Sequence, residues 1–433
     1  MQLNKYITGS KIYSLAEKLW PIDRSITGPG VRKTLAYIKE IIPDLKIKFF
    51  KSGTKVFDWT IPPEWFVNDA YISDDYGKKI IDFKKNNLHL IGYSYSIRKR
   101  IHFNELKKNL YYLKEFPDAI PYITSYYNKI WGFCISYNDF LKLNNRSFYQ
   151  VVIDTSFKKN GVMNYGEFVI KGKSKKEIIF STYICHPSLA NNELSGPCLA
   201  TFLIQWAQKN ILNPHYTYRF IFIPETIGSI AYIHKNIEKL KKNVIAGFVI
   251  TCVGDDKNWS LVTSRYENKL CDHFAIKCFK KLSIDYKKYS YLERGSDERQ
   301  YCFPSIDLPF CSVTRSKYNT YKEYHTSNDN LSFISSKGFE ESFNYYKSLI
   351  MLIDKSRIPL ITTKCEPFLS KRNLRNTLSQ VGSGKSTKNL MDILNYCDGN
   401  NTDSQIASIT SLSLKNVRNN LKILEMNRLI KYL

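Results

Sequence analysis

The sequence lacks three features that mark secreted or membrane proteins. Its ten cysteines include no CxxC pair and are scattered along a long chain, so we interpret them as reduced, mostly buried thiols. No apolar run reaches the roughly 20 residues needed to cross a bilayer. The first residues also lack the basic-then-apolar plan of a signal peptide. We therefore expect a cytoplasmic protein without a membrane partner.

Acidic side chains are scarce relative to basic ones. The chain has 39 Asp and Glu against 64 Lys and Arg, a formal net charge of +25. Such an excess can indicate binding to nucleic acid. The basic residues are, however, spread along the chain, and Lys, Asn, Ile and Tyr are abundant together, as in proteins of AT-biased genomes. We interpret the charge as a matter of composition and expect no nucleic-acid partner.

The length of 433 residues and the hydrophobic content of 43% predict two or three domains with at least one large core. Residues 61–150 show short strand patterns rich in Tyr and Trp, which predict a small inserted β-rich module. From about residue 165 onward, apolar strands alternate with longer helices, a pattern typical of a mainly parallel sheet with helices on both faces. We expect a three-layer α/β/α domain formed by residues 1–60 and 151–370. The predicted strands cover residues 178–184, 218–224, 244–253 and 308–313.

The C-terminal part has a different character. Residues 371–387 are irregular and predict a linker, whereas residues 388–433 show three helical segments and an apolar end with the spacing of a winged helix. Residues 382–387 resemble the end of a phosphate-binding loop, but Ser379 stands where that pattern needs glycine, and no strand precedes it. We interpret this stretch as a polar linker. Basic side chains leave DNA binding by the winged helix open, although docking of a protein or a second copy is favoured.

The most informative stretch is residues 181–197. An apolar strand pattern ends at Cys185 and His186, a small loop with Asn191 and Asn192 follows, and Ser195-Gly196 begins an apolar helix. Ligands of α/β proteins bind at the carboxyl ends of parallel strands. The imidazole of a histidine at such a strand end is a good zinc ligand. The pattern therefore predicts a metal or ligand site here, with a purely structural histidine as the alternative.

Three further segments have matching partners in one known fold. They read Ile-Pro-Glu-Thr-Ile-Gly at 223–228, Gly-Ser-Asp-Glu-Arg-Gln-Tyr at 295–301 and Glu-Tyr-His-Thr-Ser-Asn-Asp at 323–329. With residues 181–197 they resemble the zinc-dependent aminopeptidases of the bacterial leucyl aminopeptidase type. The chain resembles even more closely an aminopeptidase-like family of unknown function, often encoded with surface-polysaccharide or flagellar-glycan genes. Further segments that resemble this family are residues 20–28, 52–59 and 366–369.

The resemblance implies a zinc site with a general base. His186 and His325 would hold the metal with help from Asn192, and Glu225 would accept a proton from water. Neutral residues occupy three positions where the aminopeptidases carry carboxylates, namely Asn192, Thr226 and Thr251. Since neutral ligands cannot offset the charge of two cations, a single zinc ion is expected if a metal binds.

Substrate-positioning groups are expected at Ser296, Asp297, Arg299 and Arg315, because arginine can grip a carboxylate through two hydrogen bonds. A structural ion-pair network is the alternative for them. We expect a metal-dependent hydrolase that cleaves an amide or acyl bond of a small-molecule or glycan-linked substrate, in surface-glycan or flagellar-glycan biosynthesis. Two other hypotheses stay open: a member of the fold that binds a ligand or partner without catalysis, and a DNA-binding regulator that uses its winged helix.

Overall fold

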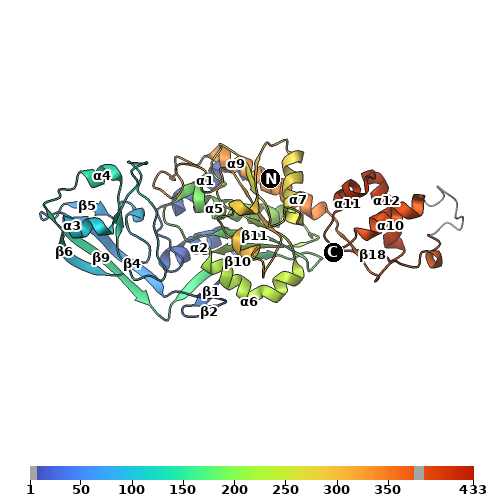
Figure 1. Cartoon of the computed structure of the whole chain (residues 1–433), viewed down its shortest axis with the longest axis horizontal. Coiled ribbons are helices and arrows are strands. Elements are labelled where there is room, and N and C mark those ends of the chain that lie inside the picture. The colour runs from blue at the N-terminus through green and yellow to red at the C-terminus, as the bar shows by residue number, and fades with distance from the viewer. Residues whose placement is uncertain (1–6, 375–384) are drawn as a thin grey trace, which may run out of the picture.

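The computed structural model describes residues 7–374 and 385–433, and a twisted eight-stranded sheet lies at its centre (Figure 1). The strand order is β1-β10-β12-β11-β13-β16-β14-β15, and the four strands from β12 to β16 are parallel. Most of the predicted linker, including Ser379, lies outside the described residues. The strands are β1 (Lys46–Lys51), β10 (Val162–Ile170), β11 (Glu177–Tyr183), β12 (Thr217–Ile223), β13 (Val244–Val249), β14 (Ser260–Val262), β15 (Lys287–Tyr289) and β16 (Phe310–Thr314).

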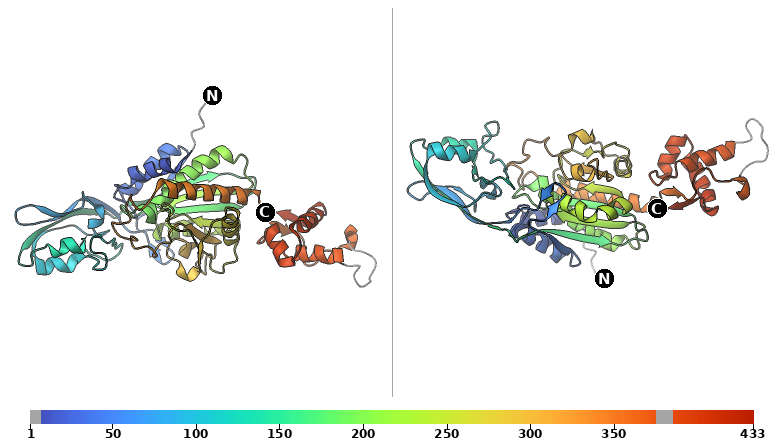
Figure 2. Two further views of the ribbon diagram at one scale, coloured as in Figure 1. Left: turned by 90° about the horizontal axis from the view of Figure 1, so that it is seen from above. Right: turned by 60° about the horizontal axis from the view of Figure 1, so that its bottom comes forward.

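Helices cover both faces of this sheet, which confirms the predicted three-layer fold (Figure 2). Alternate strand residues point to opposite layers: Phe180 packs with one layer and stacks on Phe220 and Phe248, whereas Tyr183 packs with the other. Within the described ranges, no helix is long and apolar enough to span a membrane. The first layer contains α1 (Gly9–Leu19), α2 (Pro29–Ile41), α5 (Ser195–Asn210), α7 (Leu270–Lys281) and α9 (Ser336–Lys355), and the second contains α6 (Ile227–Asn243) and α8 (Glu298–Tyr301).

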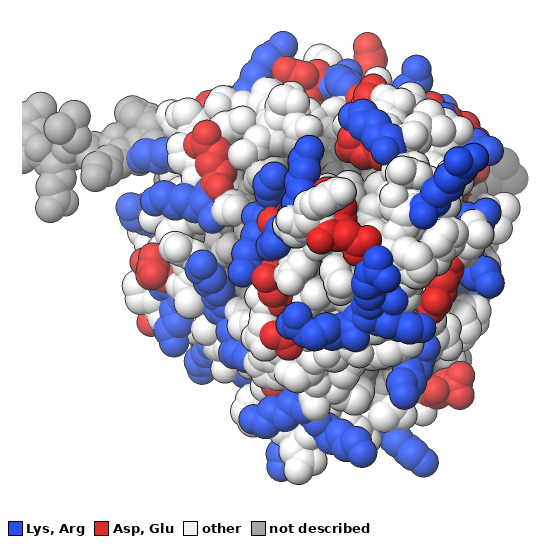
Figure 3. Space-filling view, turned by 90° about the vertical axis from the view of Figure 1, so that its left-hand side faces the viewer, with Lys and Arg blue, Asp and Glu red and all other residues white. Residues whose placement is uncertain are grey.

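A β-rich module extends from one end of the sandwich (Figure 1). Its antiparallel sheet has the order β5-β4-β9-β6, and the two long strands β4 and β9 carry the chain out and back. Figure 3, which views this end, shows lysine and arginine side chains distributed among acidic ones over the face. The elements are β2 (Lys55–Val56), β3 (Trp59–Thr60), β4 (Glu64–Ser73), β5 (Lys79–Asp82), β6 (Ile97–His102), α3 (Phe103–Leu106), β7 (Leu110–Tyr111), β8 (Phe133–Cys134), α4 (Tyr137–Leu141) and β9 (Phe148–Lys158).

The C-terminal unit is a winged helix with its own small core, as the spacing predicts. Thr402 and Gln405 form a capping box at the start of α11, and β17, which precedes the linker, pairs with β18. Its α11 begins against α7 of the sandwich, where Nε2 of His273 lies 3.2 Å from Oγ1 of Thr402 and 3.3 Å from Oγ of Ser404. The elements are β17 (Pro359–Ile361), α10 (Lys385–Asn395), α11 (Asp403–Thr410), α12 (Leu414–Met426) and β18 (Ile430–Tyr432).

A buried ion network joins three strands on the face of the sheet that α6 covers. Arg219 on β12 donates two hydrogen bonds to Glu177 at 2.7 and 2.9 Å and one to Glu167 at 2.7 Å. Burial alone would raise the pKa of Glu167, but Lys48 and Arg219 overcome it and lower the pKa to about 2. Arg219 therefore neutralises two carboxylates that the sheet has removed from water.

Replacing Arg219 by methionine is expected to destabilise the sandwich by about 3 kcal/mol, because it leaves two buried carboxylates without their main partner. Urea unfolding of the full chain, followed by circular dichroism, measures the change. Lys239→Met is the matched control: Lys239 reaches Glu177 from the surface at 3.1 Å, and its loss should cost under about 1 kcal/mol. Equal effects of the two changes would contradict this view of Arg219.

The contact between α7 and α11 should weaken in acid. Burial, with a smaller effect of Lys277, lowers the pKa of His273 to about 4 from 6.5. Since the folded pKa lies below the unfolded one, this stabilisation is complete above about pH 6.5 and is lost as the pH falls toward 4. Hydrogen exchange of α11 at pH 7, 5.5 and 4.5 tests this. His273→Gln should flatten the pH dependence of exchange in α11. The same pH dependence in both proteins would show that protonation of His273 does not weaken the contact.

Candidate active site

Three neighbouring parallel strands bring the candidate residues to one edge of the sheet. Strands β11, β12 and β13 lie side by side, and His186, Glu225 and Thr251 follow their carboxyl ends within three residues. Because the strands run in the same direction, residues just beyond their ends converge although they are far apart in the sequence. The site is therefore built on loops that start from rigid, buried strands.

The loop that follows His186 contains the π-helical turn η3 (Ala190–Leu194) and is held by buried hydrogen bonds. The side chain of Asn191 accepts from the backbone N–H of Asp255 and donates to its carboxylate at 2.9 Å. The carboxylate of Asp329 accepts from the N–H groups of Asn191 and Asn192 at 2.6 and 2.9 Å. Asn191 is thus fully engaged in shaping the loop, whereas Asn192 faces the strand ends.

Asn192 belongs to a neutral hydrogen-bonded triad. Tyr183 donates its hydroxyl to Oδ1 of Asn192 at 2.8 Å, and the same hydroxyl lies 2.6 Å from Oγ1 of Thr251. Nδ2 of Asn192 has no hydrogen-bond partner among the described residues. All three side chains are buried and uncharged, so this side of the site supplies no negative charge for a cation.

His186 lies between two carboxylates. Its Nδ1 is 3.2 Å from Glu193, and its Nε2 is 3.7 Å from Glu225. Burial would lower the pKa of His186, but the two carboxylates raise it above its usual value. Burial raises the pKa of Glu225, an effect that His186 and Arg299 oppose. Glu225 is still 18% exposed, so it can reach a ligand, and a carboxylate with a raised pKa is suited to general base catalysis.

His325 lies beside His186 with a free nitrogen. The two ring centroids are 5.5 Å apart, and the backbone at His325 adopts a φ of 55°, which is uncommon for this residue type. Its Nε2 is buried and has no hydrogen-bond partner in the described chain. Burial, together with the charge of His186, lowers the pKa of His325 to about 3. The imidazole is therefore neutral at physiological pH, the form that binds metals.

A polar cluster next to Glu225 contains three of the predicted substrate-positioning residues. Asp297 accepts from the N–H of Thr226 at 2.8 Å, and Arg299 donates to the hydroxyl of Thr226. Three buried atoms of the cluster lack partners in the part of the chain described: Oγ of Ser296, Oδ2 of Asp297 and Nε of Arg299. Burial, then the charge of Glu225, raises the pKa of Asp297 to about 7. Unpaired buried polar atoms of this kind are costly without a ligand.

Arg315, the fourth residue predicted to position a substrate, has a different placement. Its guanidinium donates to Glu341 of α9 at 2.6 Å and stacks on Trp259 at 4.3 Å. The side chain is only 3% exposed, and no contact links it to His186 or Glu225. The contacts correspond to the ion-pair alternative for this residue, because the chain after β16 turns its side chain toward α9.

Sequence reasoning missed three residues that contact His186. Glu193 and Arg24 form a buried ion pair at 3.0 Å, and Arg24 also donates to the backbone oxygen of His186 at 3.0 Å. The ring of Tyr122, from the module, lies 5.1 Å from that of His186 and 5.2 Å from that of His325. Glu193 and Arg24 belong to segments already singled out in the sequence. Tyr122 had no such signal, because only the docking of the module brings it here.

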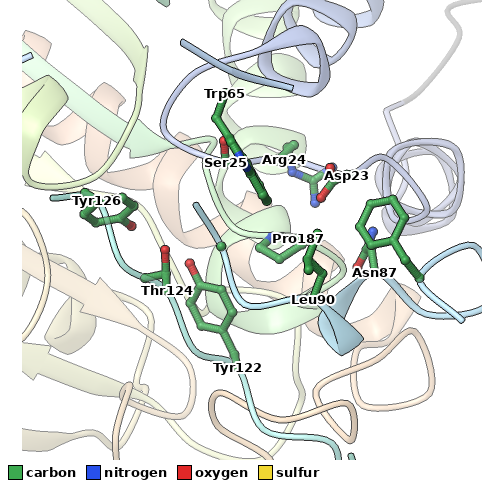
Figure 4. Close-up of a pocket in the computed structure, with 12 residues that line it drawn as sticks. Asp23, Arg24, Ser25, Trp65, Asn87, Leu90, Tyr122, Thr124, Tyr126 and Pro187 are labelled. Atoms are coloured by element: carbon green, nitrogen blue, oxygen red, sulfur yellow. The ribbon is translucent and has the colours of Figure 1, made fainter. Parts of the chain in front are cut away.

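A pocket between the module and the sandwich adjoins these residues (Figure 4). Figure 4 shows Tyr122, Thr124 and Tyr126 on one side and Asp23 with Arg24 on the other. The module contacts the site loop directly, because the N–H of Tyr122 donates to the backbone oxygen of His325 at 2.9 Å. The inserted module is therefore a wall of the candidate site.

The side chains at this edge are of types that zinc can bind. His186 and His325 provide two imidazoles, Glu225 places a carboxylate beside them, and one imidazole nitrogen is buried without a partner among the described residues. Burial raises the pKa of both Glu225 and Asp297, the charge of Glu225 adds to the shift of Asp297, and a nearby cation would stabilise the charged forms. The neutral triad offers no comparable donors for a second ion.

A second group of possible metal ligands lies at the Nδ1 edge of the His186 imidazole. Cys185, His186 and Glu193 place ligand atoms within 4.8 Å of one another. Burial raises the pKa of Cys185 well above its usual value, so the thiol stays protonated. Glu193 is already paired with Arg24. This arrangement does not favour a cation.

Two family models match different parts of the chain. The model of a family described as domain of unknown function (DUF4910) matches residues 13–356, and that of a winged helix-turn-helix matches residues 357–432. The chain belongs to the DUF4910 family. A relative from Clostridium acetobutylicum, provisionally named a polysaccharide biosynthesis protein with an aminopeptidase-like domain, is 41% identical over 427 residues and aligned over 96% of both chains.

Solved structures extend this likeness to the fold. A crystal structure from Clostridium acetobutylicum, provisionally named a peptidase, is 40% identical with a TM-score of 0.80, over 98% of this chain and 96% of that chain. BSAP, a zinc aminopeptidase from Bacillus subtilis, is 14% identical with a TM-score of 0.58, over 80% and 95% of the two chains. The predicted resemblance of this DUF4910 member to aminopeptidase-like proteins is confirmed for family and fold.

Adding two carboxylates at the neutral triad should create a binding site for one more zinc ion. In Asn192→Asp combined with Thr251→Asp, the zinc bound per chain is expected to increase by one relative to the unaltered protein, because carboxylates offset the added charge. Zinc content after exhaustive dialysis against a weak chelator measures this. Thr251→Val, which removes the hydroxyl without adding charge, should leave the content unchanged. No gain in the double variant would contradict the role assigned to the triad.

Proposed function

We propose that the protein is a metal-dependent hydrolase that cleaves an amide or acyl bond with a single zinc ion. The observation that carries this proposal is the buried, unpartnered Nε2 of His325 beside His186, with Glu225 within 3.7 Å of His186. Two imidazoles are common ligands of catalytic zinc, and a carboxylate beside them can act as the general base. A bound zinc ion supplies Lewis acidity, which polarises a carbonyl group and lowers the pKa of water.

The protein's own residues then carry the proton. Glu225 removes a proton from the attacking water and delivers it to the leaving group, a task that suits its raised pKa. Arg299 lies close enough to influence the pKa of Glu225 and has a buried Nε without a partner in the described residues. It is suited to hold an oxygen of the substrate. Asn192, with its free Nδ2, is a second donor toward the same space.

We propose a glycan-linked small molecule as the substrate, in surface-glycan biosynthesis. The name of the relative from Clostridium acetobutylicum supports this setting. Two tyrosines close to Glu225 also support it. Burial raises the pKa of Tyr126 and of Tyr324, and the charge of Glu225 adds to both shifts, which indicates that both rings lie near this carboxylate. Tyrosine rings offer an apolar face to a sugar ring and hydroxyls to its polar groups.

Binding without catalysis is a second candidate function. Asn192, Thr226 and Thr251 are neutral, which leaves few ligands for the metal. Thr226 has a φ of 62°, which is uncommon for threonine. In this conformation its N–H donates to Asp297 and its hydroxyl accepts from Arg299. Such a pocket would recognise a polar ligand even without zinc. The two functions differ in whether stoichiometric zinc is bound.

We further propose that the winged helix docks a protein or a second copy of the chain. Arg418 on α12 is paired with Asp403 at 2.7 Å, which lowers the charge available for phosphates. Apolar side chains are exposed on the same helix, with Met426 82% and Ile423 40% exposed. The same helix also exposes Lys415 and Lys422, so binding to duplex DNA is the alternative to be tested. Salt-dependent binding of the full chain to duplex DNA would contradict this proposal.

The zinc proposal predicts a defined response to substitution. Protein purified without a histidine tag should contain about one zinc ion, and His186→Ala with His325→Ala should lose it. Glu225→Gln should retain zinc and lower kcat about 100-fold or more with little change in KM, because it removes the base alone. Aminoacyl amides and N-acyl amino sugars are suitable probe substrates. Absence of zinc under replete conditions would leave the binding function as the better description.

A further inference from the structure

Glu193 is a fully buried charge near the candidate site and has an unusual backbone conformation. Its side chain has no exposure to solvent, and its backbone angles are φ 137° and ψ −74°. Residues with side chains rarely adopt such angles, and the cost is on the order of 1–3 kcal/mol. The rest of the loop, anchored by Asp329, must therefore over-determine this conformation. The result is a carboxylate directed inward at His186.

The contacts of Glu193 hold His186 at several points. One oxygen accepts from the backbone N–H of His186 and lies 3.2 Å from its Nδ1. The other oxygen accepts from Nε of Arg24 at 3.0 Å. The same Nε donates to the backbone oxygen of His186 at 3.0 Å, and Nη1 donates to the backbone oxygen of Leu19 at 2.6 Å. Arg24 and Glu193 thus fix both the backbone and the ring of His186.

We infer that Glu193, held in place by Arg24, is the positioning residue that directs Nε2 of His186 toward Glu225 and the zinc ligand His325. This inference rests on the proposed zinc site. A carboxylate at Nδ1 keeps the proton on that nitrogen, leaves the Nε2 lone pair free and makes the imidazole a better donor. Neither residue was among the candidates that the sequence suggested, and neither touches the substrate space.

The charge balance of the pair agrees with this role. A buried ion pair contributes little net stability compared with apolar residues of similar volume, so stability alone does not account for it. Arg24 neutralises Glu193, which therefore does not attract the cation to the wrong side of the ring. Segment 20–28, which resembles the aminopeptidase-like family, has a physical role here, because it places Arg24 just beyond the end of α1.

The inference is tested on the full chain by zinc affinity and by the tautomer of His186. Glu193→Gln keeps the size of the side chain but removes its charge, and its zinc affinity, from competition with a chelator, should fall about 10–100-fold. Arg24→Lys, which keeps the charge but cannot hold both oxygens, should give a smaller loss. In metal-free protein, at a pH high enough for the imidazole to be neutral, nitrogen NMR should find the His186 proton on Nδ1, and Glu193→Leu should move it largely to Nε2.

Glu64→Gln is the matched control. Glu64 is also a buried carboxylate that pairs with an arginine, Arg32, and accepts from a backbone N–H, that of Val162 at 3.1 Å. Its substitution should lower stability without changing zinc affinity or the His186 tautomer. If Glu193→Leu does not fold, Glu193→Gln and Arg24→Lys still provide both measurements.

The outcomes separate this inference from the zinc proposal. Unchanged zinc affinity in Glu193→Gln, with an unchanged tautomer, overturns the positioning role while the zinc site stands. A loss as large as in His186→Ala also overturns it, since Glu193 would then be a ligand. If the unaltered chain binds no zinc, the proposed function fails, and the tautomer in metal-free protein decides alone: a proton on Nδ1 supports the role of Glu193, and one on Nε2 overturns it.

Discussion

The loops at the carboxyl ends of the central strands are largely buried, so their backbone N–H groups depend on hydrogen-bond partners inside the protein. Asp329 meets this requirement for the loop after β11 by accepting from the N–H groups of Asn191 and Asn192. Asn191 does so for the loop after β13 through Asp255. These bonds fix the loop that places His186, and the rest of the site depends on that placement.

The same constraint determines the charge of the site. On one side, Tyr183, Asn192 and Thr251 satisfy one another without any charge. On the other side, Glu225 and Asp297 are buried close together, and the pKa values of both are raised. This difference in charge between the two sides is the basis of the single-ion proposal.

The module and the N-terminal segment act on the site from outside the sandwich. Tyr122 packs against both histidines and is tied to the backbone of His325. Arg24 acts on His186 alone, through Glu193 and through the backbone oxygen of His186. The N-terminal segment and the module, which precede the central strands in the sequence, therefore shape a site whose candidate zinc ligands and general base lie on loops that follow those strands. Changes to the module surface should accordingly be felt at the site through Tyr122.

Much of the fold and part of the site could be read from the sequence. Apolar runs of strand length separated by helices predicted the three layers, since that pattern follows from burial on both faces of a sheet. Motif residues His186, Glu225 and His325 could be named because each follows a recognisable strand or segment. We expected these side chains to lie near one another only because they follow the carboxyl ends of neighbouring strands.

Tertiary structure decided what each of these side chains contacts. Two adjacent asparagines look equivalent in sequence, yet the Asn191 side chain is hydrogen-bonded to Asp255, whereas that of Asn192 accepts a hydrogen bond from Tyr183. Arg315 is drawn to Glu341, and Glu193 is turned inward by a strained backbone. The sequence by itself determined the layers and the donor types, because these follow from local patterns of polarity. Only the fold decided the pairing of charges, because that depends on contacts between segments more than a hundred residues apart, such as Arg24 with Glu193.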